Sequence, residues 1–119
     1  MRSVRKLFVR ELDPQRIEEY RKAHAEIWPE LVSLYRRCGI IDVSCFLDGS
    51  RLAVLLEINP RVFASTREEL EAHPVEREWQ AWMARLDLNG TRTDEFVEVY
   101  RQSDHPMEQA DMADRDLRN

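Results

Sequence analysis

Proline and glycine residues divide this chain into short segments, and the order of those segments constrains the fold more than any other feature. All three glycines fall at apparent turns, and four of the five prolines mark a boundary between segments. These positions are Gly39, Gly49 and Gly90, and Pro14, Pro29, Pro60 and Pro74. The stretches between them alternate between strand-like and helix-like patterns.

Runs rich in Val, Ile, Leu, Phe and Tyr predict four strands, over residues 4–12, 41–47, 52–58 and 96–101. Apolar residues at helical spacing predict a helix that begins at Asp13-Pro14 and stops before Pro29, and further helices over 29–38, 61–72 and 75–86. The resulting order is β-α-β-β-α-β, with paired helical segments. It predicts an α+β ferredoxin-like fold, in which helices cover one face of a four-stranded antiparallel sheet.

The sheet face away from the helices needs a cover of its own. Phe8, Phe46 and Tyr100 alternate with the residues assigned to the helix-packed face, so we expect them on the open face. A second copy of the chain is the simplest cover, which predicts a homodimer of the dimeric α+β barrel type. We expect the ligand pocket on that same open face, walled in with help from the second chain.

With 119 residues, of which 43% are hydrophobic, the chain can form one domain, expected over residues 1–101. Residues 102–119 are polar and predict a mobile tail or a short terminal helix. The 18 basic residues are outnumbered by 23 acidic ones and form no stripe, which argues against nucleic acid as a partner.

No apolar run approaches the ~20 residues that a membrane-spanning helix needs, so no membrane partner is expected. The first twelve residues lack the apolar region of a signal peptide. Cys38 and Cys45 belong to no CxxC pair and are expected to be small buried residues. These features favour a cytoplasmic protein.

Aromatic and amphipathic side chains stand out as candidates for chemistry: Tyr20, His24, Trp28, Trp79 and Trp82. Aromatic platforms beside polar groups suit sugars, and histidine can transfer protons in both directions near pH 7. Each also has a plainer interpretation, because a lone histidine is more often structural and tryptophans at helical spacing are more often core. Motifs for phosphate loops, HExxH metal sites and GxSxG nucleophiles are absent, so we expect no metal and no cofactor.

The segment from Tyr20 to Leu31, YRKAHAEIWPEL, resembles the L-rhamnose mutarotase family, which has Tyr-x-x-x-His followed by Ile-Trp-Pro-Glu-Leu. Weaker similarity continues to about Tyr100. The resemblance implies a dimeric α+β fold and an isomerase that interconverts the α and β anomers of L-rhamnose without metal or nucleotide. It also implies that His24 is the acid/base residue, that Tyr20 contacts the sugar and that Trp79 is a wall of the sugar pocket.

Three departures from the family pattern alter the expected pocket walls. Gln80 replaces the second residue of a tryptophan pair, Arg10 stands where a methionine is frequent, and residues 88–93 replace a proline-rich segment. We therefore expect Gln80 and Arg10 to contact the substrate. They would suit a more polar ligand, such as another deoxyhexose or a sugar acid.

Two other functions fit the same fold, since fold does not determine activity. One is a small dimeric α+β barrel monooxygenase, with an aromatic substrate held by Trp79, Trp82 and Phe46. The other is a sugar-binding relative that has lost catalysis. The Tyr-His-Trp-Pro match makes the mutarotase the leading hypothesis.

Overall fold

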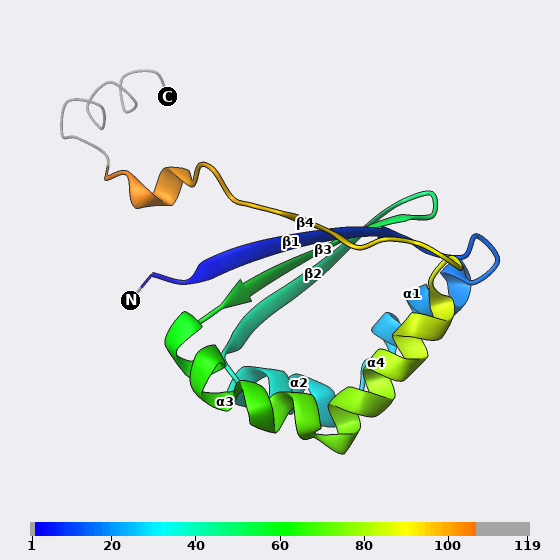
Figure 1. The fold of residues 1–119 in the computed structure, drawn as a ribbon, viewed down its shortest axis with the longest axis horizontal. Coiled ribbons are helices and arrows are strands. Elements are labelled where there is room, and N and C mark those ends of the chain that lie inside the picture. The colour runs from blue at the N-terminus through cyan, green and yellow to red at the C-terminus, as the bar shows by residue number, and fades with distance from the viewer. Residues whose placement is uncertain (1, 107–119) are drawn as a thin grey trace.

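The computed structural model describes residues 2–106 and has the expected ferredoxin-like fold. The strands are β1 (Val4–Glu11), β2 (Ile40–Asp48), β3 (Arg51–Ile58) and β4 (Asp94–Phe96). The helices are α1 (Ile17–Ala25), α2 (Pro29–Arg37), α3 (Pro60–Ala72) and α4 (Pro74–Leu86), with a short 3₁₀ helix η1 (Gln102–Asp104). The strands form one antiparallel sheet in the order β2-β3-β1-β4, and the helices lie along one side of it (Figure 1).

The first helix begins later than the sequence pattern indicates. Asp13 and Pro14 form a turn, in which the Asp13 carboxylate accepts a hydrogen bond from the Gln15 amide at 2.9 Å. Arg16 has non-helical dihedral angles, and α1 therefore begins at Ile17. As predicted, the chain breaks at Trp28, whose extended backbone precedes Pro29 at the start of α2.

Local side-chain and backbone chemistry explains the remaining helix boundaries. The Asn59 side chain accepts hydrogen bonds from the amides of Arg61 and Val62 and caps α3. His73 Nδ1 accepts a hydrogen bond from the Val75 amide at 3.2 Å and caps α4, so this histidine has a structural role. Gly39 follows α2 with a φ of +82°, a backbone conformation that favours glycine.

The last strand is shorter than predicted. β4 pairs with β1 only over Asp94–Phe96, whereas the sequence pattern predicts a strand over 96–101. Beyond Phe96 the chain still follows β1, but side chains hold it there: Glu98 pairs with Arg5, and Arg101 donates to the Ser3 carbonyl oxygen at 2.8 Å. Residues 102–104 form η1, and the rest of the expected tail, 107–119, lies outside the described residues.

Strand register assigns each side chain to one sheet face. Phe8 pairs with Val54, which packs in the core under the helices, so Phe8 lies on the helix side and not on the open face. The expectation for Phe8 was wrong because side chains alternate between the two faces along β1, so a shift of one residue in the assumed phase moves Phe8 to the other face. Phe46 and Phe96 do lie on the open face and are 57% and 52% exposed.

Buried side chains gather in two clusters under the sheet. The first joins α1, α2 and α4 to the β2–β3 hairpin end: Leu12, Tyr20, Ala23, Leu31, Leu52, Trp79, Met83 and Leu86. The second lies at the other end, beneath α3: Leu34, Cys38, Ile40, Ile58 and Leu70. Of the helices within residues 2–106, none is long and apolar enough to cross a membrane.

Candidate active site

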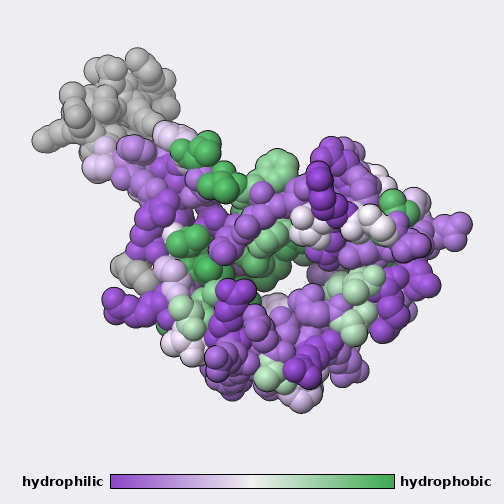
Figure 2. All heavy atoms as spheres, viewed as in Figure 1, coloured by the Kyte–Doolittle hydropathy of each residue, from purple (hydrophilic) through white to green (hydrophobic). Residues whose placement is uncertain are grey.

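Two adjoining cavities lie between the sheet and the helices, where Figure 2 shows a hollow in the surface. Their volumes are about 420 and 230 Å³, and a typical small-molecule site has roughly 300–1,000 Å³. Both are lined by His24, Tyr35, Ile40, Val43, Cys45 and Trp79. The cavities therefore open on the helix side of the sheet, and the expectation of a pocket on the open face was wrong.

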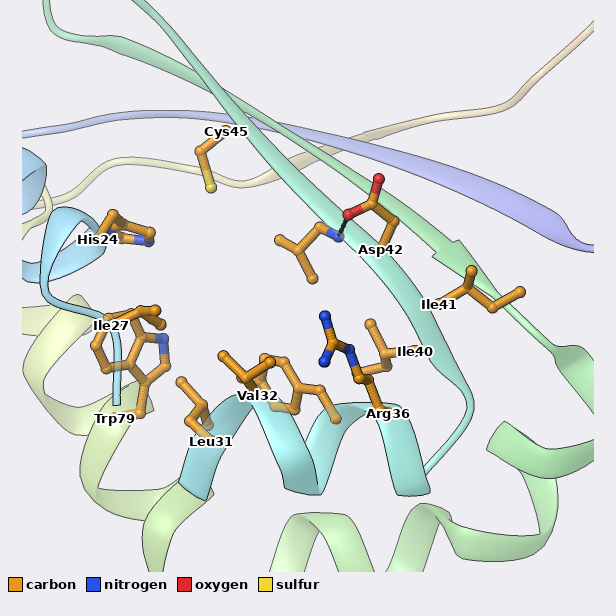
Figure 3. A pocket seen from close by; sticks show the side chains of 12 residues that line it. His24, Ile27, Leu31, Val32, Arg36, Ile40, Ile41, Asp42, Cys45 and Trp79 are labelled. Carbon is orange, nitrogen blue, oxygen red and sulfur yellow. Dashed lines mark hydrogen bonds between the residues drawn. The ribbon is translucent and has the colours of Figure 1, made fainter. Parts of the chain in front are cut away.

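His24 projects from α1 into this space (Figure 3). Its Nδ1 lies 2.9 Å from the backbone carbonyl oxygen of Tyr20, one helical turn earlier. A carbonyl oxygen can only accept, so Nδ1 carries the proton and Nε2 keeps a free lone pair. Burial lowers the pKa of His24, and the charge of Arg10 lowers it further against the opposing effect of the Tyr20 carbonyl. The imidazole is therefore a neutral base at pH 7.

Aromatic rings hold His24 on two sides. The Tyr20 ring stacks on the imidazole with centroids 4.2 Å apart, and the Trp79 ring meets its edge at 5.2 Å. Both rings are almost fully buried. Burial also raises the pKa of Tyr20, with the neighbouring Cys45 thiol adding to the rise, so the Tyr20 hydroxyl stays protonated.

Arg10 reaches the smaller cavity from β1, as expected. Its Nε donates to Asp87 Oδ1 at 2.9 Å, and both side chains are mostly buried. Asp87 thus pairs with the guanidinium and offsets part of its charge, although Arg10 still lowers the pKa of His24. The Arg10 side chain also contributes hydrogen-bond donors to the wall.

A second polar group lines the smaller cavity opposite the sheet. The Tyr35 hydroxyl on α2 donates to Glu76 Oε1 on α4 at 2.6 Å, and Gln80 Nε2 lies 3.3 Å from the same oxygen. Burial raises the pKa of Glu76 and of Tyr35. Neither Tyr35 nor Glu76 was predicted as a site residue. Tyr35 fits the apolar stripe of α2, and the spacing to Trp79 and Gln80 is the only sequence signal for Glu76.

The structure brings together all five residues predicted to form the site, since His24, Tyr20, Trp79, Gln80 and Arg10 line the smaller cavity. The other two aromatic candidates, Trp28 and Trp82, line neither cavity. Trp28 and Trp82 pack behind Trp79, and the Trp82 indole donates to Glu19 at 2.8 Å. Cys38 is buried as expected, but Cys45 lines both cavities.

The smaller and larger cavities differ in their charged walls. Arg10 and Glu76 line the smaller one, while Arg36 from α2 and Asp42 from β2 line the larger one (Figure 3). Within residues 2–106 no group of three or more His, Cys, Asp or Glu side chains is arranged to hold a metal ion. The site can thus offer one neutral base, protonated tyrosines, an aromatic wall and several polar groups.

A family model for L-rhamnose mutarotase matches residues 5–113. The chain belongs to the L-rhamnose mutarotase family. The match extends past Arg101, where the resemblance was expected to end. An L-rhamnose mutarotase from Sinorhizobium fredii is 42% identical over 83 residues, which cover 70% of this chain and 77% of that protein. One from Rhizobium etli is 39% identical over 94 residues, which cover 79% of this chain and 86% of that protein.

Solved structures support the fold. The L-rhamnose mutarotase from Formosa agariphila aligns with a TM-score of 0.65 and 21% identity, over 82% of this chain and 96% of that one. A dimeric ferredoxin-like protein from an uncultured marine organism aligns with a TM-score of 0.56 and 13% identity, over 84% of this chain and 97% of that one. At these identities the similarity shows that both proteins share the fold of this chain, and it says nothing of activity.

Proposed function

We propose that this protein is an isomerase that interconverts the α and β anomers of a neutral sugar of the L-rhamnose type, with His24 as acid and base. The observation that carries the proposal is the hydrogen bond between His24 Nδ1 and the Tyr20 carbonyl oxygen, which leaves Nε2 free beside the cavity. The membership of the L-rhamnose mutarotase family supports the reaction type.

Mutarotation opens the pyranose ring and closes it on the other face of the anomeric carbon. His24 Nε2 accepts the proton of the anomeric hydroxyl while the bond from C1 to the ring oxygen breaks. The imidazolium then delivers that proton to the ring oxygen, which gives the open-chain aldehyde and restores neutral His24. After rotation about C1–C2 the same transfers run in reverse. Both oxygens are bonded to C1 in the closed sugar, so one histidine can serve both.

Tyr20 acts as a hydrogen-bond donor and not as the proton shuttle. Its buried hydroxyl has a raised pKa, so loss of its proton would be costly. A protonated hydroxyl can still donate to a sugar oxygen and fix the ring relative to His24. Trp79 lies at the edge of the imidazole and offers a flat surface to the C–H face of a sugar.

The decisive experiment is exchange NMR on the anomers of L-rhamnose with and without the purified protein. We expect exchange well above the spontaneous rate. Saturable binding without faster exchange would instead indicate a sugar-binding relative, and oxygen consumption with a quinol would favour the monooxygenase. The monooxygenase pocket postulated from the sequence lacks support, because Phe46 lies on the opposite face of the sheet from Trp79.

We further propose that the protein works as a homodimer in the cytoplasm. The open sheet face supports a second copy there, because Leu7, Leu55 and Phe96 are cross-strand neighbours on it and Phe46 stands beside them. The free thiols of Cys38 and Cys45 suit a reducing compartment.

A further inference from the structure

The larger cavity adjoins the reacting centre but takes no part in the proton transfers proposed above. All five residues predicted to form the site line the smaller cavity, and of these only His24 and Trp79 also line the larger one. The larger cavity has a volume of about 420 Å³, against about 230 Å³ for the smaller. A monosaccharide held beside Tyr20 and Arg10 therefore leaves the larger cavity free for another group.

Aliphatic side chains form most of the wall of the larger cavity. They come from α2, from the segment just before it and from β2: Ile27, Leu31, Val32, Ile40 and Val43. The space between them opens directly onto His24 (Figure 3). Ligand sites in proteins commonly combine such an apolar wall with a few polar groups that fix the orientation of the ligand. The C–H groups of a sugar ring can pack on this wall.

Two polar side chains, Arg36 and Asp42, line the larger cavity and not the smaller one. The Arg36 guanidinium projects from α2 into the space (Figure 3). Within residues 2–106 it forms no ion pair, whereas the next residue, Arg37, pairs with Glu69 at 2.8 Å. Asp42 Oδ1 accepts a hydrogen bond from the Val43 amide at 3.0 Å, and the carboxylate can accept further donors. The cavity thus offers both donors and acceptors to a ligand.

The charges and the chemistry of the reaction restrict what this ligand group can be. Arg36 and Asp42 are opposite in sign, so an anion attracted by one is repelled by the other. Hydroxyl groups donate and accept, and a neutral polyhydroxyl group therefore suits both side chains. The reacting sugar has to keep a free hydroxyl on C1, because a glycosidic bond there prevents ring opening. A second sugar unit can therefore be attached only at another carbon.

We propose that the larger cavity is a subsite for a second, neutral sugar unit, so that the enzyme acts on disaccharides with L-rhamnose at the reducing end as well as on free L-rhamnose. Arg36 and Asp42 bind hydroxyls of the second unit, and the aliphatic wall packs on its C–H groups. This inference rests on the proposed anomer exchange and extends its substrate class. Contacts remote from C1 that are equal in the ground state and the transition state lower KM and leave kcat unchanged.

Three rhamnosyl-L-rhamnose disaccharides, linked through O2, O3 or O4 of the reducing unit, test the proposal against free L-rhamnose. Exchange NMR with the full chain follows the anomers of the reducing unit and gives kcat and KM after subtraction of the spontaneous rate. We expect at least one disaccharide to have a KM about tenfold lower than that of L-rhamnose, because it adds hydrogen bonds to charged groups. A KM equal to or above that of L-rhamnose for all three would overturn the subsite and leave the mutarotase proposal intact. Absence of catalysed exchange with every sugar would refute the proposed function and the subsite with it.

Two variants connect the difference in KM to the larger cavity. Arg36→Met removes the guanidinium, and Val32→Trp fills part of the space. In each we expect the ratio of the L-rhamnose KM to the disaccharide KM to fall toward one. Arg37→Met is the matched control, since Arg37 is the neighbouring arginine, lines neither cavity and should leave both KM values unchanged. An unaltered ratio in folded Arg36→Met and Val32→Trp proteins, checked by circular dichroism, would contradict the assignment.

Discussion

His24 donates its Nδ1 proton to the carbonyl oxygen of Tyr20 across 2.9 Å, within a single turn of α1. The tautomer of the base is thus set by local helix geometry and not by a carboxylate from another element. The same turn places the Tyr20 ring against the imidazole. One nine-residue helix therefore supplies the base, fixes its tautomer and shields one of its faces.

His24→Ala should abolish most of the anomer exchange and leave the fold intact. General acid–base catalysis contributes typically 10²–10⁴-fold, so we expect a decrease of roughly that size in the catalysed rate. Exchange NMR measures the rate, and circular dichroism checks the fold. His105→Ala is the matched control, since His105 is exposed and stacks on Tyr100 away from the cavities. Unchanged exchange in folded His24→Ala protein would eliminate His24 as the base.

Tyr20→Phe should reduce the rate much less than His24→Ala. The substitution keeps the stacked ring and removes one hydrogen-bond donor, which corresponds to about tenfold. A decrease as large as that of His24→Ala would show that Tyr20 transfers the proton itself. Exposed Tyr100→Phe provides the comparison for a tyrosine outside the site.

The rate should depend on pH only on the acid side of neutrality. The pKa of His24 lies below its usual 6.5, so the neutral base predominates at pH 7 and is lost as the pH falls through the lowered pKa. Arg10→Met removes a positive charge that lowers this pKa, so the acid limb of the pH–rate profile should move to higher pH. Arg67→Met, on the exposed side of α3, should not move it. A shift in the opposite direction would contradict the electrostatic role of Arg10.

The depressed pKa of His24 also predicts a change in stability with pH. The unfolded chain binds the proton more readily than the folded one, so the free energy of unfolding should decrease as the pH drops below 6.5. His24→Ala should remove this contribution. Urea denaturation at a series of pH values measures the slope, and identical slopes in both proteins would refute the lowered pKa.

Gly39→Ala should destabilise the fold far more than Gly49→Ala. Both glycines have positive φ, which costs an alanine about 1–2 kcal/mol. At position 39 the added Cβ would also lie 2.8 Å from the backbone nitrogen of Phe63, whereas at position 49 it meets open space. We therefore expect a further loss of about 1–3 kcal/mol for Gly39→Ala. Urea denaturation compares the two, and equal losses would show that the close approach to α3 relaxes freely.

Phe46→Glu should convert the proposed dimer to a monomer, because it puts a charge on the apolar open face of the sheet. Size-exclusion chromatography with light scattering measures the mass. Ala81→Glu, on the exposed side of α4, is the control and should leave the mass unchanged. A monomeric wild-type protein would contradict the dimer.

The sequence predicts the fold well because its proline and glycine residues set the ends of helices and strands by local backbone constraints. Pro29 and Gly39 delimit α2 through backbone constraints that do not depend on the rest of the molecule. The end of the sheet was harder to predict, because residues after Phe96 alternate as a strand does. Whether they join the ladder depends on contacts such as Arg5–Glu98, which only the folded chain reveals.

The catalytic side of the site was also accessible from sequence, since Tyr20 and His24 are one turn apart on α1. The polar wall formed by Tyr35 and Glu76 could not be predicted from the sequence. Tyr35 and Glu76 are far apart in sequence and meet only because α2 and α4 pack together beneath the sheet. The face on which Phe8 lies depends on strand register, and a shift of one residue moves it to the other face.

One wall residue of the cavity lies outside both clusters of buried side chains. Gln80 belongs to neither cluster and is exposed, although it lines the cavity. Replacing it changes what the cavity recognises with little loss of buried apolar surface. Substrate preference can therefore evolve by single substitutions that leave folding almost untouched, and members of one family can diverge in their sugars while they keep the same chemistry.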